Sequence, residues 1–392
     1  MREDGCILYT YASLFKREAF CFVLSNTNFQ EVKNIVSIRV QGAPSFYKCN
    51  VGVLQELELL LKERDIHSLL VIHGKKSFEA VQDYWPELPD FEVHYTKYAG
   101  ECSESEISRC KERAVSLEVD AVIGIGGGKA LDLAKAVGHV AKKDVILVPT
   151  LASTCAAWTP LSVIYDDEGR FVTYTIFPRS PYMVLVEPRV ILKAPLSYLK
   201  AGIADTLAKW YEARALAHRL DYIPMSVQVA LYAAKLSRDR LLEDSHRAIE
   251  DCENHRLSPA FLTILESNVL LGGMVGGFGD EYGRIAGAHT IHNALTYIPS
   301  THHLLHGEKV AYGILVQLAL EKNIEEINLL LPFFQRIGLP SKLEHLQIIN
   351  SEQVQVIANR ALAPHESIHF MKDTFSQQDI IAAIEKLGTL QN

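Results

Sequence analysis

DAVIGIGGGKALDLAKAVGHVAKKDVILVPTLAST, residues 120–154, is the most informative segment of the sequence for the fold. The apolar run at 120–125 predicts a buried strand, Gly126, Gly127 and Gly128 predict a tight turn, and residues 131–141 have helical spacing. Glycine has no Cβ, so the backbone of such a turn can approach a ligand closely, and the helix that follows offers free N–H groups. This geometry suits a pyrophosphate, although a plain tight turn has the same sequence.

A second loop strengthens the nucleotide-site hypothesis. The next predicted strand, residues 144–148, ends in PTLAST at 149–154, which contains Thr150 and Ser153. Open α/β sheets bind ligands where neighbouring strands end. Two adjacent strands that both end in loops of small and hydroxyl residues therefore predict a nucleotide site.

The flanking sequence extends the same pattern. From residue 50, predicted helices alternate with strands at 68–74 and 91–96, and Ser103 is a plausible N-cap for a helix at 103–118. This alternation predicts a parallel, doubly wound sheet. After residue 154 we expect a hairpin that turns at 166–169 and one more strand before Pro188. Residues 1–37 show no clear period, and we expect a strand and a loop at the edge of the sheet.

Beyond about residue 193 almost every segment has the helical period. The predicted fold class is thus an α/β N-terminal nucleotide-binding domain with a parallel sheet, residues 1–193, followed by an all-α C-terminal domain, residues 194–392. We see no repeat and no flexible linker, so we expect the two domains to pack rigidly around a cleft.

Composition restricts the function classes. The 392 residues are 48% hydrophobic and 22% charged, with a net charge of −8 and no long charged run. These values are typical of a soluble globular protein and disfavour nucleic acid and membrane as partners. The first residues lack a signal peptide and we find no apolar run of bilayer length, so we expect a cytoplasmic protein. Seven cysteines without a CxxC pair indicate reduced thiols.

Histidines cluster between residues 289 and 306. His302 and His303 fit an exposed polar loop. His289 and His292 lie three residues apart on a small, apolar helix and share one face, while His306 begins another predicted helix. Imidazoles from two helices could converge with a carboxylate on a divalent cation. Satisfied core histidines would give the same pattern.

Asp205 is the candidate carboxylate. It lies in AGIADTLAKWYEA, a predicted helix whose other inward positions are apolar. An unpaired carboxylate on such a face would be costly, and a cation would remove the cost. The alternative is an aspartate favoured near a helix start by the helix dipole.

Four ordered motifs carry a family resemblance. GIGGGKALDLAKA, PTLASTCAAWTPLSVIYDDEG, AGIADTLAKWYEA, and GAHTIHNAL with HGEKVAYGIL resemble the metal-dependent alcohol dehydrogenase family, in its glycerol-dehydrogenase-like branch. The resemblance runs from about residue 45 to the C-terminus and is nearest to members that reduce 2-oxoacids. It implies a dehydroquinate-synthase-like architecture, in which an α/β domain binds NAD or NADP and a helical domain holds the metal. It also suggests a homo-oligomer.

The resemblance assigns roles to single positions. It implies metal ligands at Asp205, His289 and His306. Lys209 stands where iron-dependent members have a further histidine, which leaves an open coordination position and favours zinc over iron, nickel or manganese. The implied cofactor-binding residues are Gly126, Gly127, Gly128, Lys129, Thr150, Ser153, Thr159, Leu161 and Tyr165.

Two departures from the family pattern bear on substrate and cofactor. Glycerol dehydrogenases have a substrate-binding aspartate where this chain has Cys155, and the loss of that negative charge makes room for a substrate carboxylate. NAD-preferring members have an acid after the second strand, where this chain reads His73-Gly74-Lys75-Lys76. NADPH is therefore expected to be accepted as readily as NADH, unless the two lysines are merely solvated.

The sequence thus predicts hydride transfer between NAD(P)H and a metal-bound ketone or secondary alcohol, with a small 2-oxoacid and its 2-hydroxy acid as substrates. His292 is the candidate for positioning the substrate or relaying the proton, and its alternative role is packing beside a ligand. One rival is an NAD-dependent glycerol or polyol dehydrogenase. A second is a dehydroquinate-synthase-type lyase, and a third is a sugar-phosphate-binding or regulatory protein without activity.

Overall fold

The computed structural model describes residues 36–390, so the expectation for residues 1–35 lies outside the described residues. Within this range six parallel strands form one sheet in the order β1-β8-β5-β4-β2-β3. The strands are β1 (Phe46–Cys49), β2 (Ser68–His73), β3 (Glu92–Lys97), β4 (Ala121–Gly126), β5 (Asp144–Pro149) and β8 (Met183–Val186). All six residues of β4 are buried, which explains its continuous apolar sequence.

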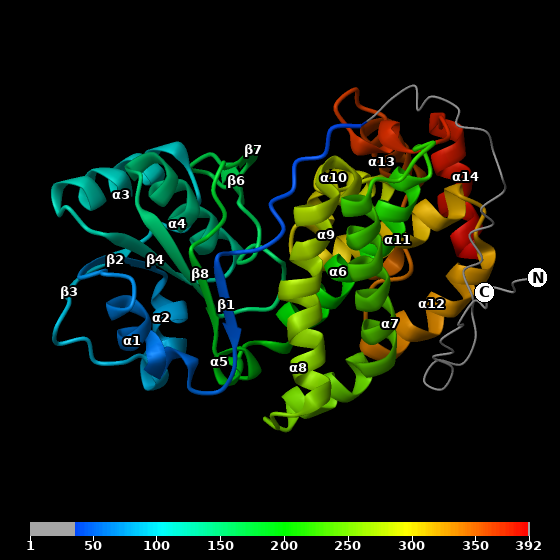
Figure 1. The fold of residues 1–392 in the computed structure, drawn as a ribbon. Helices are drawn as coiled ribbons and strands as arrows, with labels where there is room; N and C mark the ends of the chain where they lie inside the picture. Colours follow the sequence, from blue (N-terminus) through cyan, green and yellow to red (C-terminus); the bar gives the residue numbers. More distant parts are fainter. Residues whose placement is uncertain (1–35, 391–392) are drawn as a thin grey trace, which may run out of the picture. The chain divides into compact units, whose positions relative to one another are not determined.

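Helices cover both faces of the sheet (Figure 1). α1 (Leu57–Lys62) and α2 (Lys75–Val81) pack against one face, in a core with Val71 and Ile123. α3 (Glu104–Ser116) and α4 (Gly128–Ala141) cover the other face. Ser103 caps α3 as expected, because its side chain accepts a hydrogen bond from the Glu106 N–H group. The predicted doubly wound sheet is confirmed.

The predicted hairpin is confirmed, whereas one strand of the main sheet was not predicted. The expected hairpin is present as β6 (Leu161–Tyr165) and β7 (Phe171–Ile176), which pair antiparallel. β1 is too short to give a periodic signal and was not predicted. It pairs with β8, so β8 lies inside the sheet between β1 and β5.

From Pro188 to residue 390 the described chain is helical, in agreement with the prediction. The helices are α5 (Pro188–Leu192), α6 (Leu196–Ala217), α7 (Met225–Glu253), α8 (Pro259–Glu266), α9 (Gly272–Gly279), α10 (Gly287–Leu295), α11 (His306–Leu320), α12 (Ile324–Ile337), α13 (Ser351–Ala361) and α14 (Gln377–Leu390). A π-helical turn, Ser267–Leu271, joins α8 to α9. One hydrophobic core runs from Val122 of the sheet to Leu387 of α14, and the domain boundary at 193/194 stays a prediction.

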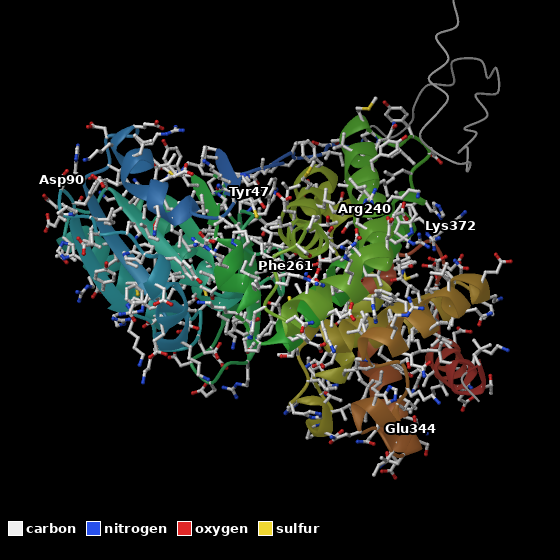
Figure 2. The ribbon with its side chains drawn as sticks, turned by 90° about the horizontal axis from the view of Figure 1, so that it is seen from below. Tyr47, Asp90, Arg240, Phe261, Glu344 and Lys372 are labelled. Atoms are coloured by element: carbon white, nitrogen blue, oxygen red, sulfur yellow. The ribbon has the colours of Figure 1, made fainter. Side chains whose placement is uncertain are left out.

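The expectation that no apolar run reaches bilayer length needs a correction. Pro259–Gly283 is long and apolar enough to span a membrane by length and composition. It is weak evidence for a span, since 56% of its most apolar window is buried inside the protein. The last residue of α8 contacts β1, because Tyr47 donates a hydrogen bond to Glu266 at 3.5 Å; Figure 2 labels Tyr47 of β1 and Phe261 of α8.

Candidate functional site

One face of α6 carries three charged residues at helical spacing. Asp205, Lys209 and Glu212 are separated by four and then three residues, so their side chains project from the same side of the helix. Asp205 and Glu212 are buried, and Lys209 is half-buried. Buried charges need partners, which identifies this face as the centre of a polar site.

The structure brings Asp205, His289 and His306 together. Asp205 Oδ1 lies 3.2 Å from His289 Nε2 and 3.2 Å from His306 Nε2, and the two nitrogen atoms are 3.3 Å apart. Ligand atoms around a tetrahedral zinc ion at about 2.1 Å are roughly 3.4 Å apart. The three atoms therefore form a triangle of the size that one divalent cation requires. The His306 side chain is 43% exposed, which leaves one side of the triangle open.

Glu212 fixes the orientation of His289. Its Oε2 atom lies 2.7 Å from His289 Nδ1, while its Oε1 atom accepts hydrogen bonds from the N–H groups of Ala286 and His289. When Nδ1 donates to Glu212, the lone pair of Nε2 points into the triangle. Burial lowers the pKa of His289, but Glu212 and Asp205 outweigh burial and raise that pKa to about 9. The pocket thus favours positive charge at this position.

Asp205 is held ionised. Burial raises the pKa of its carboxyl group, but Lys209, His289 and His306 outweigh burial and hold that pKa well below its usual range. An ionised aspartate is an acceptor for a hard cation. The donor set of one carboxylate and two imidazoles fits zinc, and the same set suits other divalent first-row metals.

His292 lies beside the triangle. Its ring centroid is 4.1 Å from that of His306, and its Nδ1 atom lies 3.0 Å from the Asn293 side-chain oxygen. Burial, His306, His289 and Lys309 together hold the pKa of His292 well below its usual range, so the ring is neutral. By contrast, His302 and His303 are exposed.

Close helix packing places the ligands. A Cβ atom on Gly307, next to His306, would lie 1.8 Å from the Ala201 carbonyl oxygen of α6. A Cβ atom on Gly313 would lie 2.2 Å from the carbonyl oxygen of Ala288, next to His289. Only glycine permits these approaches, so the three helices come close enough for the triangle to form.

The glycine turn has the predicted form. β4 ends at Gly126, and α4 begins at Gly128 after Gly127 as N-cap. A Cβ atom on Gly126 would lie 2.7 Å from Ala130 Cβ, so the turn has no room for a larger residue there. The first N–H groups of α4 have no partner within the helix and suit an anion such as pyrophosphate.

The second predicted loop lies beside this turn and contacts the helical part. The Thr150 N–H group donates to the Gly126 carbonyl at 3.0 Å, and Ser153 is half-buried in the same loop. The Asn268 side chain donates to the Ala152 carbonyl at 2.9 Å, and a Cβ atom on Gly202 of α6 would lie 1.9 Å from that oxygen. Asn268 and Gly202 thus fix this loop one helical turn from Asp205.

The remaining predicted cofactor residues surround α4. The Lys129 ammonium pairs with Glu101 at 2.6 Å and lies 4.9 Å from the Tyr165 ring centroid, so it is engaged by protein groups. The carbonyl groups of Thr159 and Leu161 accept hydrogen bonds from the buried Lys135 ammonium. Lys135 of α4 therefore fixes the backbone of Thr159 and Leu161 against that helix.

Cys155 and Lys209 meet opposite Gly272. A Cβ atom on Gly272 would lie 3.3 Å from Lys209 Cε and 3.5 Å from Cys155 Cβ. Burial lowers the pKa of Lys209, but Cys155, Asp205 and Glu212 outweigh burial and hold that pKa above its ordinary value. Lys209 is therefore a cation beside Asp205.

The sequence did not predict Glu212 or Asn268 as site residues, and it did not predict the role of Lys209. Glu212 was recoverable in part, since it lies seven residues after Asp205 on one helix face. Lys209 was noted only as a missing ligand. Asn268 gives no sequence signal, because its partner Ala152 is 116 residues away and is a backbone carbonyl.

Comparisons with known proteins identify similar chains. The sequence profile described as iron-containing alcohol dehydrogenase matches residues 44–188. Hydroxycarboxylate dehydrogenase A of Escherichia coli (strain K12) is 40% identical over 359 residues, which cover 90% of this chain and 98% of the relative. Glycerol dehydrogenase of Escherichia coli O6:H1 is 40% identical over 299 residues, which cover 74% of this chain and 80% of the relative.

A solved structure shares the fold. The crystal structure of a probable glycerol dehydrogenase from Sinorhizobium meliloti 1021 superposes with a TM-score of 0.79 at 31% identity, covering 90% of this chain and 98% of that chain. The family resemblance inferred from the four motifs is therefore confirmed.

Proposed function

The chain belongs to the iron-containing alcohol dehydrogenase family, and on that premise we propose that it interconverts a small 2-oxoacid and the corresponding 2-hydroxy acid, using NADH or NADPH. It is an oxidoreductase acting on CH–OH groups, as its named relatives are. The proposal on substrate rests on one observation. Cys155, and not a carboxylate, lies next to Lys209, one helical turn from Asp205. This side of the site therefore lacks a negative charge that would repel a 2-oxoacid.

Asp205, His289 and His306 would hold one divalent cation, with zinc as the proposed metal. When bound, such an ion supplies Lewis acidity toward the oxygen of the substrate. The chain's own residues do the rest. Glu212 would orient His289, and the neutral ring of His292, close to His306, would hold or move a proton at the substrate hydroxyl group.

The cofactor would bind at the glycine turn. The N–H groups at the start of α4 would bind the pyrophosphate, and the loop of Thr150 and Ser153 would line the nicotinamide side. Lys75 and Lys76 are exposed at the end of β2, and within residues 36–390 neither has an ion-pair partner. Their charge supports acceptance of the NADPH 2′-phosphate.

A glycerol or other polyol dehydrogenase is the second candidate, because several similar proteins are glycerol dehydrogenases. Cys155 separates the two candidates. A carboxylate at this position would accept hydrogen bonds from polyol hydroxyl groups, whereas a thiol accepts them weakly.

An assay of metal-stripped and metal-reconstituted protein tests the proposal. We expect reduction of 2-oxobutyrate with NADH or NADPH, lost after chelation and restored by added zinc or another divalent ion. Oxidation of glycerol should be much slower. Activity confined to glycerol, or 2-oxoacid reduction that chelation leaves untouched, would contradict the proposal.

The variant Cys155→Asp sharpens this test. The new carboxylate would pair with Lys209 and repel an anionic substrate, so we expect slower 2-oxobutyrate reduction and faster glycerol oxidation. Cys155→Ser keeps the position neutral and is the matched control. It should retain the preference for 2-oxobutyrate.

A further inference from the structure

We propose that Lys209 binds the carboxylate group of the substrate and thereby makes the site selective for 2-oxoacids over neutral ketones. This inference rests on the proposed function and assigns its substrate specificity to one side chain.

Lys209 lies on the face of α6 that also carries Asp205. Lys209 follows Asp205 by one helical turn, so the two Cβ atoms are about 5–6 Å apart on the same face. In a 2-oxoacid the carboxylate is bonded directly to the carbonyl carbon. A substrate whose carbonyl oxygen lies at the open side of the triangle would thus have its carboxylate within reach of a long, flexible lysine side chain.

The neighbours of Lys209 leave its charge available. Among residues 36–390 no carboxylate lies within ion-pair distance of its ammonium group, and its side chain lies beside Cys155 at Gly272. Asp205 is engaged by His289 and His306, and Glu212 is engaged by His289 and two backbone N–H groups. A half-buried cation without an ion pair is stabilised when an anion arrives.

The surrounding backbone also leaves space for this side chain. Gly272 begins α9 after the π-helical turn and faces both Lys209 Cε and Cys155 Cβ. A side chain at position 272 would crowd the lysine, and a carboxylate at position 155 would neutralise it. Gly272 and Cys155 thus leave Lys209 uncrowded and without a carboxylate at this point.

Lys309 is the competing cation. It is buried on α11, three residues after His306, and has no ion pair within residues 36–390. Its charge acts on His292 and lowers the pKa of that ring. The experiment must therefore compare the two lysines.

The test compares 2-oxobutyrate with 1-hydroxy-2-butanone, in which a CH2OH group replaces the carboxylate, in metal-loaded full-length protein. For Lys209→Met, compared at equal metal content, we expect the ratio of kcat/KM for 2-oxobutyrate to kcat/KM for hydroxybutanone to fall on the order of 10- to 100-fold. Lys209→Arg should recover part of the loss. Lys200→Met is the matched control, because Lys200 lies on the same helix near Gly338 and outside the site.

Oxamate, an unreactive 2-oxoacid analogue, gives a readout that does not depend on turnover. Its affinity for the enzyme–NADH complex, measured by calorimetry, should weaken in Lys209→Met by the same factor, with NADH affinity unchanged. Should Lys209→Met fail to fold, Lys209→Gln takes its place. An unchanged preference between the two ketones in the Lys209 variants, or a preference lost in Lys309→Met alone, would overturn the inference. Failure of the proposed function looks different, because then the wild-type protein neither reduces 2-oxobutyrate nor binds oxamate.

Discussion

Asp205 shows how single residues create the chemistry of this site. One of its oxygen atoms lies 3.2 Å from both imidazoles, while Lys209 stands one turn away. Without neighbours, burial would favour the neutral acid. Lys209, His289 and His306 reverse that preference. Asp205 therefore stays ionised and can bind a divalent cation.

The first prediction concerns Glu212. In Glu212→Gln the amide group would replace the acceptor that faces His289 Nδ1, and the ring would turn or change its tautomer. The Nε2 lone pair would then no longer point into the triangle. We expect metal affinity to fall by about 10- to 100-fold, measured by competition with a chelator for zinc.

Glu250→Gln is the control for this prediction, because Glu250 is an exposed glutamate of α7 whose side chain takes no part in the site. Its metal affinity should match that of the wild-type protein. Equal metal affinity in Glu212→Gln would show that Glu212 does not orient His289.

At the scale of elements, helix contacts determine where the ligands lie. α6, α10 and α11 approach each other through Gly307 and Gly313, which adjoin the backbone of Ala201 and Ala288. The apolar pattern of each helix would tolerate alanine at either position. The contact between helices does not, because the nearest atoms are rigid backbone carbonyls.

The second prediction is that Gly313→Ala destabilises the protein by about 1–3 kcal/mol or more, since α10 and α11 must move apart. The shift would also displace His289, so metal affinity should fall as well. Gly388→Ala in α14 is the matched control. A Cβ atom there meets nothing within 4 Å, and its higher helix propensity should stabilise the protein by roughly 0.5–1 kcal/mol. Urea unfolding measures both, and equal stabilities for the two variants would contradict the packing argument.

The third prediction concerns the start of α8. The Ser258 hydroxyl group accepts from the Phe261 N–H group as N-cap and donates to the buried Asp251 carboxylate, which also pairs with Arg256. Burial raises the pKa of Asp251, but Ser258 and Arg256 outweigh burial and lower that pKa. A carboxyl pKa that is lower in the folded state stabilises the protein above the unfolded-state value of about 3.9 and loses this effect as pH falls.

Asp251→Asn should therefore be less stable than the wild-type protein at pH 7, by about 1 kcal/mol. The difference should shrink as pH falls below about 4. Urea unfolding from pH 7 to pH 3 measures it, and a difference that does not depend on pH would contradict the assigned role of Asp251.

At the scale of the whole described chain, the loop after β5 links the sheet to the helices. Asn268 donates to the Ala152 carbonyl, and the Trp158 indole donates to the Gly42 carbonyl at 2.8 Å while its ring packs on Gly273 of α9. The loop that would face the cofactor and the helix that carries Asp205 are thus fixed against each other. The distance between this loop and α6 decides whether a bound cofactor can reach a substrate at the Asp205–His289–His306 triangle.

The fourth prediction is that Asn268→Ala leaves the Ala152 carbonyl without a partner and costs about 1–3 kcal/mol of stability. The loosened loop should also weaken NADH binding, measured by fluorescence titration. Asn254→Ala removes an exposed side-chain hydrogen bond to the Glu250 carbonyl and is the control. NADH affinity that is equal in both variants would contradict the role of Asn268.

The class of fold could be predicted from local sequence patterns, and the candidate metal site from these patterns together with the family resemblance. Strand and helix periods are local properties, so β4, the glycine turn, α4 and the helical second half could be predicted from residues close together in the chain. Asp205, His289 and His306 could be singled out as candidates because charged or imidazole side chains on apolar helices need a partner, and the family resemblance then implied that they bind a metal.

How these pieces meet depends on contacts between residues that are far apart in the chain. β1 has four residues and takes its place from pairing with β8, more than 130 residues later. Glu212, Asn268 and the available charge of Lys209 matter because of groups that lie far away in the sequence, several of them backbone carbonyls or N–H groups. Backbone groups are the same at every residue, so the sequence holds no mark of such contacts, and they exist only once the helices have packed.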